Sequence, residues 1–259
     1  LAFIWILSLT ASVQFAVVFF LSRRVIKFGL SFDISYAKKI LRASLPVAFS
    51  ILFTAVYIRT DALMISLMRP VSDVGIYRLA AKILEALVFF PALLVELTMP
   101  SFTKFALKKG DVFDRVFKKT FNILFLMAIP VVVGLIIFAR PIVLLLGGEE
   151  FAASALPLRI LALVIGMVFL NNLGGKALIA LEFQKAGMWV YLSGAVLNIF
   201  ANFLVIPRYS YIGASFTTLV TETLVTIAMF LILYRKIGFK PNITRAFKDL
   251  KEILKPERI

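Results

Sequence analysis

Residues 120–139 read TFNILFLMAIPVVVGLIIFA, twenty positions without a single charged side chain. A helix of about this length crosses the roughly 30 Å hydrocarbon core of a membrane. Soluble bundles need a polar face on most helices, and such faces are missing here. We therefore predict an all-α, polytopic membrane helical bundle of about seven transmembrane helices, the other apolar stretches being residues 1–21, 44–68, 74–99, 152–180, 186–206 and 211–234.

The amino-acid composition excludes several classes of chemical function. Of the 259 residues, 61% are hydrophobic, against about 45–50% in soluble domains, and there is neither cysteine nor histidine. Disulfides, thiolate chemistry and the commonest general base are thereby excluded. The sequence also lacks a nucleotide loop, a metal-spaced cluster and a nucleophile–base pair. We predict a protein that is not an enzyme, with no catalytic residues, no metal site and no cofactor.

The charges indicate an orientation. If the spans alternate, residues 22–43, 100–119, 181–185 and 235–259 share one side, and they hold most of the 29 lysines and arginines. The positive-inside rule makes this side cytoplasmic, with the N-terminus of the chain outside and the C-terminus inside. Such loops favour anionic membrane lipids as partners. Because the charges are dispersed and form no polar domain, nucleic acid is not an expected partner.

Charged residues inside the spans are candidate functional groups. A charge at the bilayer centre costs at least about 2.5–3.5 kcal/mol, so such residues usually face a bundle interior or a wet cavity. Counting along the helices places six of them in one layer of the outer half. That layer is either a cavity wall with an excess of cations, or a set in which Lys82 pairs with Glu85 and the arginines reach outer headgroups. Its members are Arg59, Asp61, Arg78, Lys82, Glu85 and Arg159.

A second polar set lies in the last three spans. Asparagine and threonine there serve either as hydrogen-bond donors between helices or as a lining for substrate. Glu222 differs, because a lone carboxyl group deep in a span must be neutral or paired, and it is therefore a candidate proton or cation site. The other members are Asn171, Asn172, Lys176, Asn198, Asn202, Thr218, Thr221 and Thr226.

Three stretches resemble a known family. Residues 44–105 contain a proline-led helix, an arginine/aspartate turn and the pattern VGIY…A.KI.E. Residues 174–222 contain Asn198, the IP.Y…GAS turn of Ile206–Ser215 and the TE pair of Thr221–Glu222, and Gly147–Phe151 matches an LG.E.F loop. Their order and spacing resemble polysaccharide biosynthesis flippases, the Wzx-like branch of the multidrug/oligosaccharidyl-lipid/polysaccharide (MOP) exporter superfamily, whose members share a MATE-like fold.

The resemblance implies two six-helix lobes around a central cavity that is often cationic. Residues 1–21 are then the last helix of a first lobe, 22–43 a cytoplasmic linker, 44–235 a six-helix lobe, and 236–259 a basic cytoplasmic tail. Because the chain opens at Leu1 inside an apolar run, we expect the first lobe of the same protein to be missing from it. The localisation implied is the cytoplasmic membrane of a bacterium or archaeon.

The implied activity is the flipping of polyprenyl-pyrophosphate-linked oligosaccharide, such as O-antigen, by alternating access. A glycan polymerase or ligase is a possible partner. Alternatives are a MATE-type cation or drug antiporter, a flippase for the lipid precursor of peptidoglycan, and a membrane scaffold that transports nothing. The substrate-binding candidates are Arg59, Arg78, Lys82, Lys176, Asn172 and Asn198, and the ion-coupling candidates are Asp61, Glu85 and Glu222.

Overall fold

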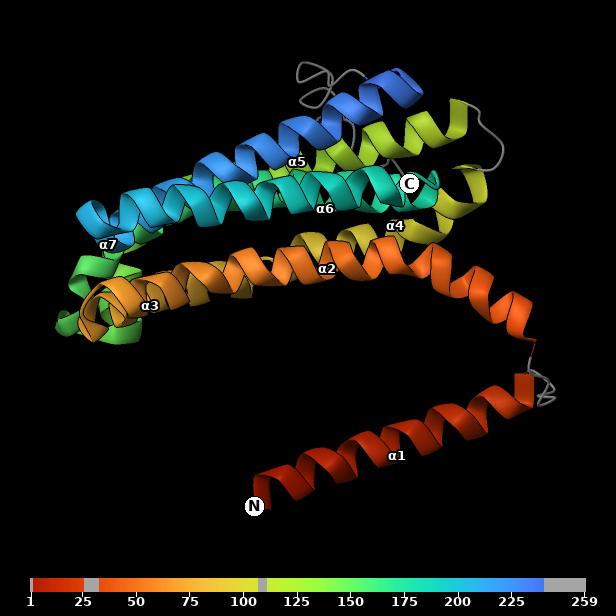
Figure 1. Cartoon of the computed structure of the whole chain (residues 1–259), viewed down its shortest axis with the longest axis horizontal. Helices are drawn as coiled ribbons and strands as arrows, with labels where there is room; N and C mark the ends of the chain where they lie inside the picture. The colour runs from red at the N-terminus through yellow and green to blue at the C-terminus, as the bar shows by residue number, and fades with distance from the viewer. Residues whose placement is uncertain (1, 26–32, 107–110, 240–259) are drawn as a thin grey trace, which may run out of the picture. The chain divides into compact units, whose positions relative to one another are not determined.

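A computed structural model describes residues 2–25, 33–106 and 111–239, and within these ranges every regular element is a helix. The helices are drawn in Figure 1. They are α1 (Ala2–Val25), α2 (Ile34–Met68), α3 (Val71–Leu87), α4 (Phe89–Ala106), α5 (Asp111–Gly147), the short 3₁₀ helix η1 (Glu149–Ser154), α6 (Ala155–Ala180) and α7 (Gln184–Ile237). Most of the predicted basic tail lies outside the described residues.

Four helical segments are long and apolar enough to cross a membrane within the described ranges. They are Ile34–Met68, Val112–Gly147, Glu149–Ala180 and Gln184–Ile237. The last of these contains two predicted spans, residues 186–206 and 211–234. They meet at Ser210, whose φ of 47° and ψ of −133° are not helical. The prediction of an all-α membrane bundle is confirmed.

The predicted span 74–99 is in fact divided between α3 and α4. The break falls at Val88, and Pro91 follows in the first turn of α4. Proline has no N–H and its ring clashes with the carbonyl group four residues earlier, here that of Leu87. The continuity of the apolar run therefore hid a break that the proline imposes.

The start of α2 also differs from the prediction. Residues 22–43 were expected to form a cytoplasmic linker before the lobe that begins at residue 44, whereas α2 runs without a break from Ile34 through Pro46. The chain divides into two compact units, residues 1–43 and 44–259, and this boundary falls inside α2. Everything that follows concerns the second unit.

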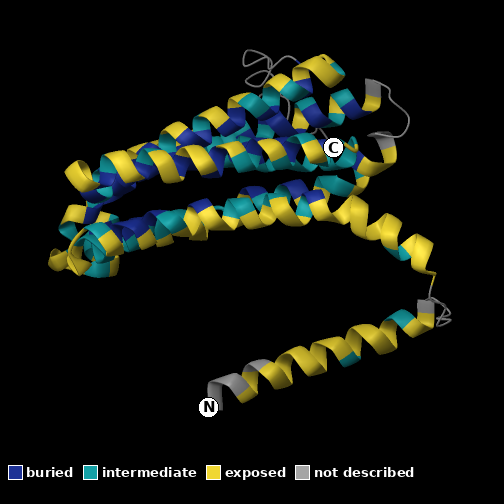
Figure 2. Cartoon of the chain, in the orientation of Figure 1, coloured by how far each residue is buried: buried dark blue, intermediate teal, exposed yellow. Residues whose placement is uncertain are grey.

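The core of the second unit is formed mainly by α5, α6 and the two arms of α7, residues 184–209 and 211–237. Buried residues lie on their facing sides and exposed residues on the outside, as Figure 2 shows. Many of the exposed residues are large and apolar. The arms of α7 approach closely at Gly194, where a Cβ atom would lie 2.6 Å from Cγ2 of Val225. Glycine at this position is what permits the close contact.

Candidate functional site

Asp61 on α2 is enclosed by donors from three other helical segments. Its Oδ2 accepts hydrogen bonds from the hydroxyl groups of Tyr77 (2.6 Å) and Thr218 (2.7 Å), and its Oδ1 accepts one from Nδ2 of Asn202 (2.6 Å). The donors come from α3 and from both arms of α7. Asp61 is 1% exposed. We call these four residues the Asp61 cage.

Glu222 forms a second buried carboxylate site, one helical turn from Thr218 on α7. Oε1 accepts a hydrogen bond from the hydroxyl of Tyr57 (2.5 Å) and Oε2 one from Nδ2 of Asn171 (3.1 Å). Tyr191 donates in turn to Oδ1 of Asn171 at 3.3 Å. Glu222 is 3% exposed.

The two carboxylate sites lie side by side because α2 and the second arm of α7 each supply one carboxylate and, one turn away, the hydroxyl donor to the other helix's carboxylate. Tyr57 and Asp61 are four residues apart on α2, and Thr218 and Glu222 are four residues apart on α7. Residues at this spacing share a helix face. Within the described residues, no lysine or arginine forms an ion pair with either carboxylate. Both acids are thus held only by neutral donors.

A cavity of about 300 Å³ lies against both sites. Its polar lining contains three acids, Asp61, Glu85 and Glu222, and no lysine or arginine. Three tyrosines, Tyr57, Tyr77 and Tyr191, also line it. The structure therefore brings the three predicted ion-coupling candidates together around one acidic cavity, which suits a cation better than a pyrophosphate.

An adjoining cavity of about 400 Å³ has a different lining. It shares Asn172 and Tyr191 with the first cavity, and it adds Lys176 and Gln184. Lys176 forms an ion pair with Glu96 of α4, and Oε1 of Gln184 is a buried acceptor without a hydrogen-bond partner. Two substrate-binding candidates, Lys176 and Asn172, thus lie together here, and Asn172 also lines the acidic cavity, whereas Lys176 does not.

The other predicted bases lie outside the acidic cavity. Arg59 is exposed and lies two residues, or about 200° around the helix, from buried Asp61. Lys82 pairs with Glu85 at 3.5 Å, as one of the two readings of the sequence expected. Arg159 donates from Nε to the carbonyl oxygen of Ile136 at 3.3 Å. Arg59 and Arg78 make no hydrogen bond or ion pair within the described ranges.

Asn198, the remaining substrate-binding candidate, belongs instead to the Asp61 side. Its Oδ1 accepts a hydrogen bond from Nδ2 of Asn202 at 3.1 Å, and its side chain is fully buried. Oδ1 of Asn202 and Nδ2 of Asn198 are left without partners in this dry interior. Buried polar groups are nearly always satisfied, so these two atoms mark the cage as a place for a further ligand or water.

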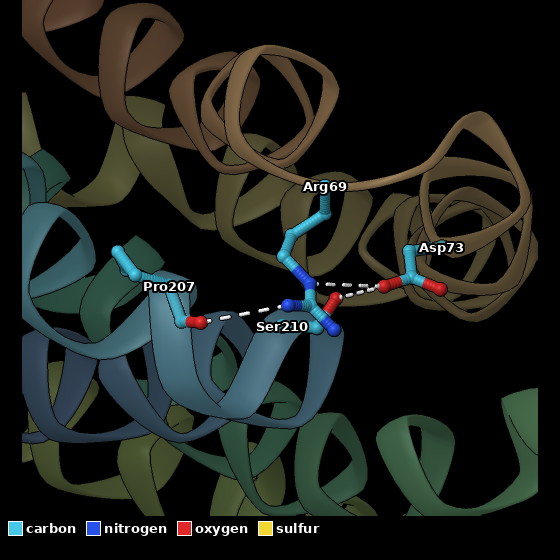
Figure 3. Close-up of polar contacts among 4 residues, drawn as sticks. All are labelled: Arg69, Asp73, Pro207 and Ser210. Carbon is cyan, nitrogen blue, oxygen red and sulfur yellow. Dashed lines mark hydrogen bonds and ion pairs between the residues drawn. The ribbon is translucent and has the colours of Figure 1, made fainter.

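Polar contacts also close one end of the same helices, as Figure 3 shows. Ser210 donates from its hydroxyl to Oδ2 of Asp73, and Arg69 contacts the same oxygen through Nε at 3.4 Å. Arg69 also donates from Nη1 to the carbonyl oxygen of Pro207 at 3.5 Å. We call Arg69, Asp73 and Ser210 the latch.

Sequence reasoning missed the tyrosines. Tyr57, Tyr77 and Tyr191 lie in apolar runs and count toward hydrophobicity, yet their hydroxyl groups donate to Glu222, Asp61 and Asn171, respectively. One signal was available, since a buried tyrosine hydroxyl usually finds a polar partner. Asp73 and Ser210 were missed for another reason, because they sit at helix ends, where polar residues are ordinary.

The fold defines a class of protein. The chain resembles an outward-facing multidrug resistance MATE transporter of the MOP superfamily (TM-score 0.67, 17% identity, 83% of this chain and 50% of that one). It also resembles the lipid II flippase MurJ in an inward closed conformation (0.67, 15%, 89% and 49%). A third similar structure is a MOP superfamily transporter from Pyrococcus furiosus, described as having a binding pocket of reverse polarity (0.66, 17%, 85% and 48%). This is therefore a multi-pass membrane protein with a MOP-type fold, and it spans about half the length of each of these structures.

The family follows from the sequence match. The family model described as polysaccharide biosynthesis protein matches residues 1–156, and the chain belongs to that family. No curated protein matches the chain.

Proposed function

We propose that this chain is one lobe of a flippase that moves a polyprenyl-pyrophosphate-linked oligosaccharide across the cytoplasmic membrane for cell-surface polysaccharide synthesis. The observation that carries the proposal is the coincidence of two findings, a polysaccharide biosynthesis family match and a MOP transporter fold. A family that makes surface polysaccharide needs a route for glycan across the membrane, and this fold is found in transporters. Transport, rather than catalysis, is the activity the fold supports.

The proposed mechanism is alternating access, in which this lobe rocks against a first lobe. Support comes from the likeness to an outward-facing MATE transporter and to an inward closed MurJ, both with a TM-score of 0.67. A single lobe that fits both conformations is consistent with a unit that moves as a rigid body. The N-terminus of the chain is then outside, and the latch faces outward, because its loops carry few basic residues.

The division of charges supports separate roles for the two groups of residues. Asp61 and Glu222 are proposed to couple transport to a proton or a monovalent cation, with Glu85 at the edge of the same cavity. Each buried carboxylate has neutral donors only, so binding one positive charge there changes the net charge of the lobe interior. A ligand that changes a buried charge also shifts the balance between two conformations.

Arg59 and Arg78 are the proposed contacts for the pyrophosphate, together with Lys82. Arg59 and Arg78 have no ion-pair partner within the described residues. A guanidinium group can bind phosphate in a bidentate manner, through two parallel hydrogen bonds. They are therefore available to a substrate at the surface of the lobe. Lys176 and Asn172 are proposed to contact sugar hydroxyl groups, since amide and ammonium groups suit them, whereas Asn198 is fully buried and bonds to Asn202 of the Asp61 cage. Anionic membrane lipids are the proposed surroundings of the basic loops, and a glycan polymerase or ligase is the proposed recipient of the product.

One observation favours a second candidate, a cation or drug antiporter. The cavity beside Asp61 and Glu222 is lined by three acids and no base, and such a lining suits an organic cation. The two candidates separate in one experiment. Loss of the protein should trap lipid-linked glycan on the cytoplasmic face if it is a glycan flippase, whereas it should raise sensitivity to cationic drugs if it is an antiporter.

A further inference from the structure

The latch joins the ends of every helical segment that builds the Asp61 cage. Arg69 follows the last residue of α2, Asp73 lies in the first turn of α3, and Ser210 separates the two arms of α7. The cage residues come from these same four segments. The cage and the latch are thus two polar layers of one four-part bundle.

The spacing between the layers is two turns on three of the four segments and one turn on α3, where Asp73 precedes Tyr77 by four residues. Asp61 precedes Arg69 by two turns, Asn202 precedes Ser210 by two turns, and Thr218 follows Ser210 by two turns. Because residues four apart share a helix face, each segment points both residues toward the same interior.

An apolar layer lies between the cage and the latch. Midway along these segments are Ile65, Ile206 and Ala214, all fully buried and all members of one apolar cluster. Tightly packed apolar side chains exclude water and ions, and hydrophobic constrictions gate channels in this way. We call these three residues the plug.

Ser210 holds the latch in a strained conformation. Its φ of 47° lies in the region that favours glycine, and serine rarely adopts it. Such strain persists only where surrounding contacts enforce it, and it collects at switching positions. At Ser210 the chain passes from one arm of α7 to the other, and its hydroxyl donates to Oδ2 of Asp73 on α3. Loss of that bond removes a contact that holds the junction of the arms against α3.

We propose that Arg69, Asp73 and Ser210 form a gate that opens and closes the route between the outer face of the membrane and the Asp61 cage. The inference rests on the proposed function in taking Asp61 as a cation-binding group and the latch end of the lobe as the outer one. When the latch is closed, the plug is dry and Asp61 is sealed from that face. When Ser210 releases Asp73, the junction of the two α7 arms separates from α3, and water and cations reach the cage.

The arrangement also explains why the gate is polar. The Arg69 side chain is 37% exposed, whereas that of Asp73 is 16% exposed. Water and ions at the membrane surface therefore compete for the latch contacts, while the plug beneath stays dry. A cation arriving at Asp73 displaces Arg69 and Ser210, so the species to be admitted favours the open latch.

Reporter thiols test the gate, because these 259 residues contain no cysteine. Ser215→Cys places a thiol beside the plug, where the serine is fully buried and donates to the carbonyl oxygen of Tyr211. Ser50→Cys places one at the adjoining cavity of about 400 Å³, where that serine donates to the carbonyl oxygen of Pro46. The protein is kept in its native membrane, any other thiol being replaced first. A small membrane-impermeant methanethiosulfonate is applied from either face.

Ser210→Gly and Ser210→Ala are compared in this background with Ser193→Ala. Both Ser210 variants lose the hydroxyl, but only glycine also relieves the strain. Ser193 is the control, because it lies on the same helix and donates only to Val190 of its own turn. A hydrogen bond to a charged acceptor is lost, so the labelling rate of Ser215→Cys from the outer face should rise about 10- to 100-fold in both Ser210 variants. Ser50→Cys should be unaffected.

The proposal is overturned by an unchanged labelling rate in both Ser210 variants, or by an equal rise at Ser50→Cys, which indicates general loosening. Thr217→Cys, buried and bonded to the carbonyl oxygen of Gly213, is a second reporter should Ser215→Cys fail to fold. The labelling needs no glycan substrate. Normal glycan export after gene deletion would therefore refute the proposed function while leaving the gate tested on its own.

Discussion

Thr218 donates a hydrogen bond of 2.7 Å to Asp61, although 157 residues separate them in the chain. This contact ties α2 to the second arm of α7, and the bond from Tyr57 to Glu222 repeats it one turn away. Helix packing in membranes gains little from the hydrophobic effect, so polar contacts between helices carry more of the specificity. The same side chains thus build the lobe and enclose its two carboxylates.

Asp61→Asn should separate stability from activity. The substitution keeps the shape of the side chain and the acceptor for Tyr77 and Thr218, and it removes a buried charge that has no ion-pair partner. We expect the Asn202 amide to turn over so that its Oδ1 accepts from the new Nδ2. The melting temperature of the purified protein should then stay the same or rise while export falls, the usual trade-off at a functional group. A variant that exports normally would remove Asp61 from the coupling role.

Tyr57→Phe should lower stability through a single lost donor. The ring stays in place, but the buried Oε1 of Glu222 loses its hydrogen bond. An unsatisfied buried acceptor costs about 1–3 kcal/mol of unfolding free energy. Thermal denaturation in detergent measures this. Tyr211→Phe is the control, since no described residue bonds to the Tyr211 hydroxyl, and an equal loss in both variants would contradict the account.

The helices were largely predictable from the sequence, but their partners were not. Apolar length alone identifies spans such as residues 120–139, because crossing the hydrocarbon core sets that length. The break at Val88 was hidden, since a local proline effect leaves hydropathy unchanged. The junction at Ser210 was expected as a loop between two spans, and the structure shows instead a single strained residue.

The sequence pointed to the acids of the candidate site, but it did not show how the helices bring them together. The cost of burying charge draws attention to acids in apolar runs, among them Asp61, Glu85 and Glu222, and equally to Glu96, which pairs with Lys176 instead. Their meeting in one cavity depends on how α2, α3 and α7 pack, and periodicity carries no such information. Counting depth along the helices placed Arg59 in the same layer as Asp61. In the structure, Arg59 is on the exposed side of α2 and Asp61 is on the buried side.

Arg59→Ala and Arg78→Ala should reduce export with little effect on stability. Neither side chain is held by an ion pair within the described ranges, so truncation removes no internal contact of that kind. Losing a charge-assisted contact to phosphate should lower export about tenfold for each variant. Lys118→Ala is the control, because Lys118 pairs with Asp114 away from both cavities. Intact export in the double variant would refute the proposed role of these two arginines in binding the pyrophosphate.

Gly194→Ala and Gly134→Ala should change stability in opposite directions. A Cβ at Gly194 would lie 2.6 Å from buried Val225, whereas nothing lies within 4 Å of one at Gly134. Overpacking costs about 1–3 kcal/mol, while alanine gains up to about 1 kcal/mol over glycine in a helix. Melting temperatures of the two variants check this, and a stabilised Gly194→Ala would show that the arms of α7 are not closely packed.

The most direct test of glycan flipping is to delete the gene in its host and measure intact lipid-linked oligosaccharide on each face of the membrane, using an impermeant glycan label. The account predicts accumulation on the cytoplasmic face, reversed by the wild-type protein and not by the Arg59→Ala, Arg78→Ala double variant. Normal display of glycan on the outer face, together with new sensitivity to cationic drugs, would contradict it and assign the acidic cavity to cation export.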